Sequence, residues 1–238
     1  MKNLLHSFSN PQKAEINKRF FKTGKGEYAE HDVFIGVTVP QIRTIAKKFY
    51  KEVTSAEISS LLHSKIHEER ALALMILVEK YQKTKDDKVV NFYLDQKNLH
   101  YVNNWDLVDL SCYKILGEYL LEKPDKTSIL YGFAQSESIW IQRIAIVSTL
   151  AFIRKWQFEH TIRIAEMLLN DNHNLIHKAT GWMLREVGKK DKDILLNFLG
   201  QHHTKIPKIT LSYAVEKLTH DEKVSIKSFF ITPPKNCD

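Results

Sequence analysis

Apolar residues recur every three or four positions along most of the chain, which is the pattern of amphipathic helices. Near the N-terminus the pattern predicts helices at residues 11–21, 41–50 and 56–63. Asn10 is the predicted N-cap of the first helix and Ser55 that of the third, because a short polar side chain can accept a hydrogen bond from a first-turn N–H group. With only 8 glycines and 6 prolines in 238 residues, the chain is poor in turn residues. An all-α fold is therefore predicted.

A buried helix is predicted at residues 110–121, and the stretch 103–109, with the sequence NNWDLVD, leads into it. If Trp105 opens this helix, Asp109 lies one turn further along the same face, because residues four apart are helix neighbours. An aromatic ring and a carboxylate side by side can stabilise a developing cation. The alternative is that Trp105 is a core aromatic residue and Asp109 a capped or solvated acid.

The sequence resembles itself in three places, where a short polar break is followed by a basic residue and an apolar helix. The basic residues are Arg70, Arg143 and Lys178, so the first gap of 73 residues is about twice the second of 35. The helix that Trp105 opens lies about midway along the first gap, where one more repeat is expected. A period near 36 residues with two helices in each unit is typical of a helical-repeat array. The alternative is a non-repeating helical bundle.

The repeats predict one all-helical domain over residues 1–238. Residues 1–60 would form N-terminal helices, residues 61–218 the repeats, and residues 219–238 a C-terminal tail that docks the pair Phe229-Phe230. Stacked HEAT-like helical hairpins form an α-solenoid with a concave face. We expect that face to be a basic groove.

The charge of the chain indicates a polyanionic partner. Its 35 Lys and Arg against 28 Asp and Glu give a net charge of +7, which favours nucleic acid through counterion release. No segment approaches the roughly 20 apolar residues of a membrane span, and no secretory signal is evident. Two distant cysteines, Cys112 and Cys237, do not form a disulfide framework, so a reducing, cytoplasmic setting is expected.

Neither a metal nor a cofactor is predicted. The pairs His63/His67 and His173/His177 have helical spacing, but no third ligand or thiolate falls near either pair, as a zinc site requires. The two glycines of the 22–28 loop do not form the glycine-rich phosphate loop of nucleotide-binding proteins. Cys112 lies in an apolar run and is interpreted as a core residue.

Aromatic and charged residues recur at the helices that the repeats would place on one surface. Arginine there can hold phosphates through paired hydrogen bonds, although salt bridges to carboxylates are the common alternative. The recurrence at the repeat period favours a shared groove, with Arg143, Arg185 and Lys178 as candidate phosphate contacts. The recurring pairs are Trp105 and Asp109, Trp140 and Arg143, and Trp182 and Arg185.

Three motifs together, Asn104–Asp109, Ile139–Ile146 and Lys178–Glu186, resemble the AlkD-type family of bacterial DNA alkylation repair enzymes. These are DNA glycosylases built from HEAT-like repeats. The resemblance covers nearly the whole chain, from about residue 11 to residue 218, and includes Phe34–Pro40. Three motifs in the same order are far more specific than any one of them.

The resemblance implies Asp109 as the catalytic acid, Trp105 and Trp182 as aromatic residues facing the sugar, and Arg143 as a phosphate contact. Two positions depart from the family: Phe20 stands where a tyrosine is expected, and Thr38 where a glutamine is expected. The 22–31 segment is also longer than in the founding member. Phe20 and Thr38 are therefore candidate DNA contacts whose roles differ from the family pattern.

The expected function is excision of cationic N3- or N7-alkylated purines from double-stranded DNA, by a monomer associated with the bacterial nucleoid. The family is understood to grip the backbone and sugar without closing a pocket around the base. One alternative is a non-catalytic repeat protein that binds distorted DNA. Another is a protein–protein scaffold, which is the usual role of HEAT arrays. The fold alone does not decide between them.

Overall fold

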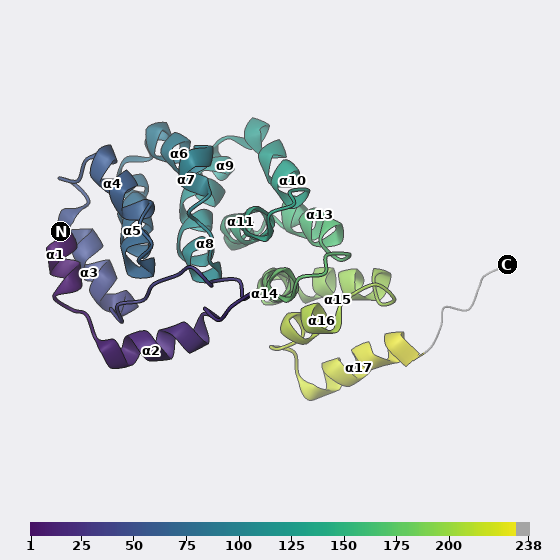
Figure 1. Cartoon of the computed structure of the whole chain (residues 1–238). Coiled ribbons are helices and arrows are strands. Elements are labelled where there is room, and N and C mark those ends of the chain that lie inside the picture. Colours follow the sequence, from purple (N-terminus) through teal and green to yellow (C-terminus); the bar gives the residue numbers. More distant parts are fainter. Residues whose placement is uncertain (232–238) are drawn as a thin grey trace. The chain divides into compact units, whose positions relative to one another are not determined.

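The computed structural model of the chain describes residues 1–231 (Figure 1). The predicted all-α class is confirmed, because the regular secondary structure of these residues is helical apart from an isolated bridge between Val33 and Ile66. Contacts within the chain define two compact units, residues 1–119 and residues 120–238. Each unit is described by itself.

The first unit consists of N-terminal helices followed by a hairpin-like succession of helices. Its α-helices are α1 (Lys2–His6), α2 (Pro11–Phe20), α3 (Val39–Phe49), α4 (Ser55–Leu62), α5 (His67–Thr84), α6 (Asp87–Leu94), α7 (Gln96–Leu99) and α8 (Trp105–Cys112).

The second unit continues the same alternation of helices. Its helices are a short 3₁₀ turn (Pro124–Lys126), α10 (Ser128–Ala134), α11 (Ile139–Ser148), α12 (Leu150–Arg154), α13 (Glu159–Met167), α14 (Asn174–Gly188), α15 (Lys192–Gln201), α16 (Lys208–Ala214) and α17 (His220–Ile231).

The predicted N-terminal helices are present, with one correction. The Asn10 side chain caps α2 by accepting a hydrogen bond from the Lys13 N–H at 3.0 Å, as expected. Helix α4 is capped by Thr54, and the prediction of Ser55 as its cap is wrong. The Thr54 backbone is extended and its hydroxyl and N–H both bond the Glu57 side chain, so the reciprocal capping box places Ser55 inside the helix.

Trp105 opens α8, as predicted, and the buried helix continues well beyond it. A π-helical stretch, Tyr113–Gly117, joins α8 to α9 (Glu118–Glu122), which spans the boundary between the units in sequence. Within α8, Leu107, Val108 and Cys112 are buried, which confirms Cys112 as a core residue.

The predicted repeat period agrees with the helix starts. Helices α5, α8, α11, α14 and α16 begin 34 to 38 residues apart, close to the predicted period of about 36. The chain therefore has an α-solenoid-like succession of helical hairpins. The single-domain organisation and the concave basic groove stay predictions.

The C-terminal segment begins with a helix, although it was expected to be a tail. Helix α17 covers its first residues from His220. The predicted docking of Phe229-Phe230 concerns side chains that lie outside the described part of the chain, as does Cys237.

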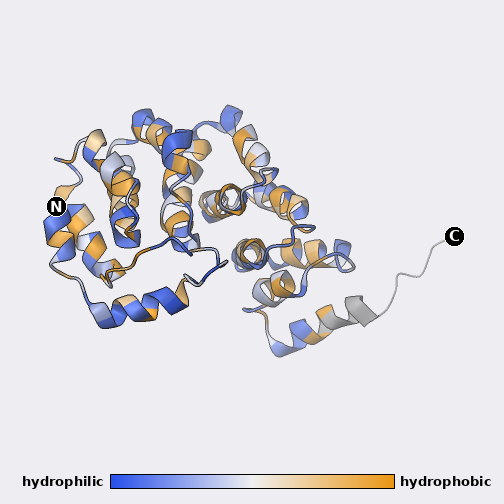
Figure 2. Ribbon diagram, in the orientation of Figure 1, coloured by the Kyte–Doolittle hydropathy of each residue, from blue (hydrophilic) through white to orange (hydrophobic). Residues whose placement is uncertain are grey.

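The core of the first unit is built on α5. From Ala71 to Val78 every residue of this helix is buried, and α5 packs against α3, α4 and α8. A helix that is apolar all round belongs inside a protein. Helix α2 is the opposite case, since Figure 2 shows it as largely hydrophilic and Ala14 is its buried residue. No described helix is both long and apolar enough to cross a membrane.

An unusual helix end in the second unit gives a stability prediction. After α12, Trp156 has a left-handed backbone (φ 61°), and the bonds Trp156 N–H to Ile153 C=O and Gln157 N–H to Phe152 C=O form a Schellman motif. Glycine usually occupies this left-handed position. The indole is 62% exposed, with the Lys190 ammonium 5.2 Å from its ring centre.

We expect Trp156→Gly to be more stable than Trp156→Ala by about 1 kcal/mol, because only glycine avoids the Cβ penalty of the left-handed region. Both variants lose the same ring and the same contact with Lys190, so their difference isolates the backbone. Urea unfolding of the two proteins gives this difference. Equal stabilities would show that the motif carries no strain at this position.

Candidate functional site

The Trp105 ring is held in a stack of aromatic side chains at the start of α8. The Phe21 ring lies almost parallel to Trp105, at 5.3 Å and 14°, and Phe34 also stacks on Phe21, at 4.9 Å and 22°. Phe20 meets Trp105 edge-on at 5.7 Å. Aromatic pairs of this geometry stabilise beyond their buried area. The indole of Trp105 is therefore fixed in orientation while remaining half-buried.

Asp32 ties the beginning of α8 to the beginning of α5. Its Oδ2 accepts a hydrogen bond from the Asn104 Nδ2 at 3.0 Å, and the Asn104 Oδ1 accepts the backbone N–H of Trp105 at 2.8 Å. The Asp32 Oδ1 accepts from the Arg70 guanidinium at 2.5 Å. Because Asn104 is the N-cap of α8, Asp32 helps to set where that helix starts and where Trp105 points.

The His67 imidazole bridges two carboxylates at the same place. Its Nδ1 lies 3.0 Å from Asp32 Oδ2 and its Nε2 lies 2.8 Å from Asp106 Oδ2. The side chains of His67 and Asp32 are almost fully buried, and that of Asp106 is 20% exposed. When His67 is protonated, both its N–H groups donate and both carboxylates are satisfied.

The electrostatics favour this charged form. Burial by itself lowers the pKa of His67, but the charges of Asp106 and Asp32 and their hydrogen bonds raise the pKa to about 9. For Asp32, burial would raise the pKa, yet the hydrogen bond from His67 and the Arg70 charge hold the pKa below its usual value. The cluster is thus a buried imidazolium between two anions.

Protonation of His67 predicts how stability depends on pH. The folded pKa is raised from 6.5 to about 9, so the stabilisation is complete below pH 6.5 and is lost as pH rises towards 9. A shift of this size corresponds to about 3 kcal/mol. The free energy of unfolding should fall across this window, and His67→Gln should remove most of the fall. His220→Gln, at an exposed histidine, is the control. A slope unchanged in His67→Gln would contradict the assignment.

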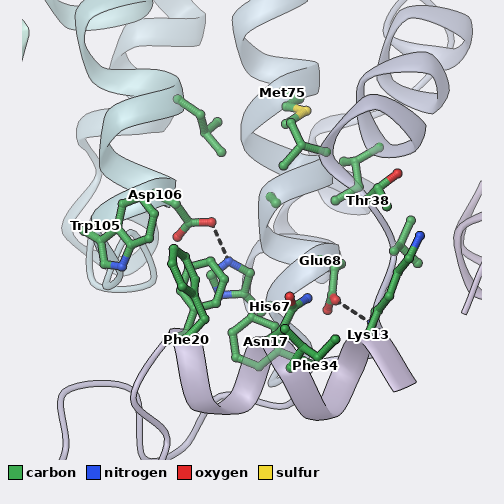
Figure 3. Close-up of a pocket in the computed structure, with 18 residues that line it drawn as sticks. Lys13, Asn17, Phe20, Phe34, Thr38, His67, Glu68, Met75, Trp105 and Asp106 are labelled. Atoms are coloured by element: carbon green, nitrogen blue, oxygen red, sulfur yellow. Dashed lines mark hydrogen bonds and ion pairs between the residues drawn. The ribbon is translucent and has the colours of Figure 1, made fainter. Parts of the chain in front are cut away.

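Three of the predicted residues line one cavity of about 420 Å³ in the first unit (Figure 3). Phe20 ends α2, Thr38 caps α3 and Trp105 begins α8, and all three face this space. Thr38 also bonds Gln41, through its hydroxyl to Oε1 at 2.7 Å. Asp109 lies one turn beyond Trp105 on α8, as the sequence predicted, and it is half-buried.

The other predicted residues belong to the second unit, and three of them lie on α14. Lys178 is exposed, Trp182 is half-buried, and Arg185 is ion-paired with Glu216. Gly181 explains the local sequence, because a Cβ there would meet the Thr210 carbonyl oxygen of α16 at 2.5 Å. The glycine therefore lets α16 approach α14 closely beside Trp182.

Arg143 is buried, with 5% of its surface exposed, near the start of α11. Its Nη1 donates to the Leu175 carbonyl oxygen of α14 at 2.6 Å, so the side chain links the two helices. Its role as a phosphate contact stays a prediction.

The Asp32–His67–Asp106 cluster is the part of the site that the sequence analysis missed. His67 was considered only as half of an i, i+4 pair for metal. The sequence does contain a pattern that indicates this cluster: His67 is 35 residues from Asp32 and 39 from Asp106, and both separations are close to one repeat. His67 begins α5 and Asp106 follows the first residue of α8, and positions one repeat apart at helix starts lie side by side in a solenoid. Among the described residues no group of His, Cys, Asp and Glu could hold a metal ion.

The comparisons with known proteins place this architecture in a family. The family model described as DNA alkylation repair enzyme matches residues 1–218. The chain belongs to the DNA alkylation repair enzyme family. A solved structure described as a predicted DNA alkylation repair enzyme from Enterococcus faecalis has a similar fold, with a TM-score of 0.71 and 20% identity over 89% of this chain and 97% of that chain. The comparison with curated proteins finds no match.

Proposed function

We propose that the protein is a DNA glycosylase that removes cationic N3- or N7-alkylated purines from double-stranded DNA. The observation that carries the proposal is the start of α8, where a rigidly stacked Trp105 is followed one turn later by Asp109. Membership of a DNA alkylation repair family supplies the substrate class. Hydrolysis of the N-glycosidic bond needs no cofactor.

The chemistry suits an acid and an aromatic ring that act on the sugar. A purine alkylated at N3 or N7 is cationic and departs as a neutral base, so it needs no general acid. The deoxyribose becomes oxocarbenium-like as the bond breaks, and the Asp109 carboxylate would stabilise it and orient the attacking water. The Trp105 ring would attract the same cation, an interaction of about 0.5–2 kcal/mol. Trp182 keeps its predicted role as a second such ring.

The two alternatives predict different behaviour. A protein that only binds distorted duplexes would retain damaged DNA without releasing a base. A protein scaffold would show no preference for DNA. The network around Asp32 and His67 supports the enzyme. Burying charged groups is costly, and here the buried charges fix the start of the helix that carries Trp105 and Asp109.

The direct test is to incubate the purified protein with methylated duplex DNA and to analyse the bases that it releases. The proposal expects 3-methyladenine and 7-methylguanine in the soluble fraction. Retention of the DNA with no free base would favour the non-catalytic alternative, and no retention would favour the scaffold.

Arg143→Ala separates a phosphate contact from a purely structural role. Loss of stability is expected in either case, because the Leu175 carbonyl loses a charged donor, at a cost of about 1–3 kcal/mol. If Arg143 also binds phosphate, affinity for damaged and intact duplexes should fall by similar factors. The slope of log K against log salt should also become shallower by about one unit or less. An unchanged slope would make Arg143 structural. Lys178→Ala, at an exposed lysine that is also a predicted phosphate contact, should make the slope shallower without the loss of stability.

A further inference from the structure

Helix α3 of the first unit carries a basic surface. Its cations are Arg43, Lys47 and Lys48, and Lys51 follows one turn after Lys47; all four are exposed. Residues 33–51 contain no Asp or Glu. None of the ion pairs formed among the described residues involves these four side chains. We call Arg43, Lys47, Lys48 and Lys51 the α3 basic face.

The helices that pack against α3 do not neutralise the α3 basic face. Helix α1 carries no acid, and the acids of α5 are Glu68, Glu69 and Glu79. Glu68 accepts hydrogen bonds from the backbone N–H groups of residues 35 and 36, and Glu69 pairs with Lys2 at 2.9 Å. Glu79 belongs to no ion pair of the described residues. Even when Glu52, the next acid in the sequence, is counted, four cations and one anion give +3.

The energetics of the helix itself do not explain the α3 basic face. Arg43, Lys47 and Lys51 are four residues apart, so they share one side of the helix, where like charges are destabilising. The helix dipole favours Lys47 in the last turn, but Arg43 lies in the middle of the helix. A lysine on α2 shows the usual arrangement, since Lys18 pairs with Glu15 at 2.6 Å. The face therefore has the charge that a polyanion would complement.

The α3 basic face begins beside the candidate site. Thr38 caps α3 and lines the same cavity as Trp105 (Figure 3), and Ile42, the residue before Arg43, lines it too. From Arg43 to Lys51 the face extends about 12 Å, at about 1.5 Å per residue. Duplex DNA carries one phosphate for about every 1.7 Å of its axis, so several phosphates match this length.

We propose that the α3 basic face binds the sugar–phosphate backbone of the duplex that flanks the lesion. The candidate phosphate contacts of the proposed function, Arg143, Arg185 and Lys178, belong to the second unit, so this face adds a contact made by the first unit. Contacts to phosphate hold a duplex in register and carry no information about the base. The inference requires that the protein binds duplex DNA, and it does not require catalysis.

The first experiment removes two charges of the face. Lys47→Gln with Lys51→Gln should lower the affinity for an intact duplex of about 25 base pairs about tenfold, and the slope of log K against log salt should become shallower by about two units or less. Lys83→Gln with Lys88→Gln is the matched control, because it removes two exposed lysines of α5 and α6 and should bind as the wild type does. Unchanged affinity in the first variant, or an equal loss in both, would overturn the proposal.

The second experiment locates the contact on the DNA. A stable analogue of an abasic site fixes the register of the duplex, and single phosphates are replaced in turn by uncharged methylphosphonates. We expect a run of flanking positions on one side of the analogue where the replacement weakens binding of the wild type but not of the Lys47 and Lys51 variant. The same sensitive positions in both proteins, or none in either, would contradict a flank contact.

Base release separates this inference from the proposed function. In single-turnover assays the Lys47 and Lys51 variant should keep the maximal rate of 7-methylguanine release, while the protein concentration that gives half of this rate rises about tenfold. If the variant loses duplex affinity but the wild type releases no base, the α3 basic face stands and the proposed glycosylase fails. If the wild type releases base and the variant binds equally well, only the α3 basic face fails.

Discussion

Asp109→Asn is expected to lower the rate of 7-methylguanine release by about 100- to 1000-fold, the usual effect of removing one preorganised group that stabilises transition-state charge. The amide has nearly the same size as the carboxylate, so it removes the charge and leaves the shape of α8. Affinity for duplex DNA and the melting temperature should change little. Single-turnover release assays with enzyme in excess measure the chemical step directly.

Two further variants make the assignment of Asp109 specific. Asp125→Asn makes the same chemical change at an exposed residue of the second unit and should release base at the wild-type rate. Asp106→Asn, three residues from Asp109, removes the negative charge that faces the protonated His67, so it should lower stability as well as activity. If Asp109→Asn keeps the wild-type rate while Asp106→Asn is stable and inactive, the acid is Asp106.

The second large effect concerns the charge of the damaged base. If the protein stabilises the sugar and protonates no base, release should be confined to purines made cationic by alkylation. Hypoxanthine, uracil and ethenoadenine are neutral and should stay in the DNA, because a neutral base leaves poorly without a general acid. A release assay on duplexes that differ only in 7-methylguanine or hypoxanthine measures the ratio.

His67 makes this comparison more informative than the sequence suggested. From the sequence no histidine was evident beside the motif, but the structure places a protonated imidazole next to Asp106. Both its N–H groups bond carboxylates, and its pKa of about 9 makes it a weak acid for protonating a base. Comparable release of hypoxanthine would show that a general acid operates, and His67 would be the residue to test.

Much of the fold could be predicted because it depends on local patterns. The apolar periodicity located the helices, and the spacing of Arg70, Arg143 and Lys178 gave the repeat period that the helix starts show. The positions of Trp105 and Asp109 one turn apart on α8 followed from helix geometry alone. These features can be read along the sequence and need no knowledge of contacts between distant segments.

The rest depends on contacts between distant residues, which a local pattern does not carry. The Asp32–His67–Asp106 cluster joins three segments, and its residues look ordinary in each segment alone. The cap at Thr54 competes with the equally suitable Ser55 one residue later, and the geometry of Glu57 decides between them. The cavity of the first unit is lined by residues of α2, α3, α5 and α8, so no single motif predicts it.

The most direct measurement uses a duplex with one 7-methylguanine at a defined site, incubated with purified protein in single-turnover conditions. Free base is quantified by chromatography, and abasic sites are quantified by strand cleavage in alkali. The proposed glycosylase activity predicts equal amounts of free 7-methylguanine and abasic sites. Asp109→Asn should lower the rates at which both form by the same factor. Tight binding of the duplex with neither product would contradict it.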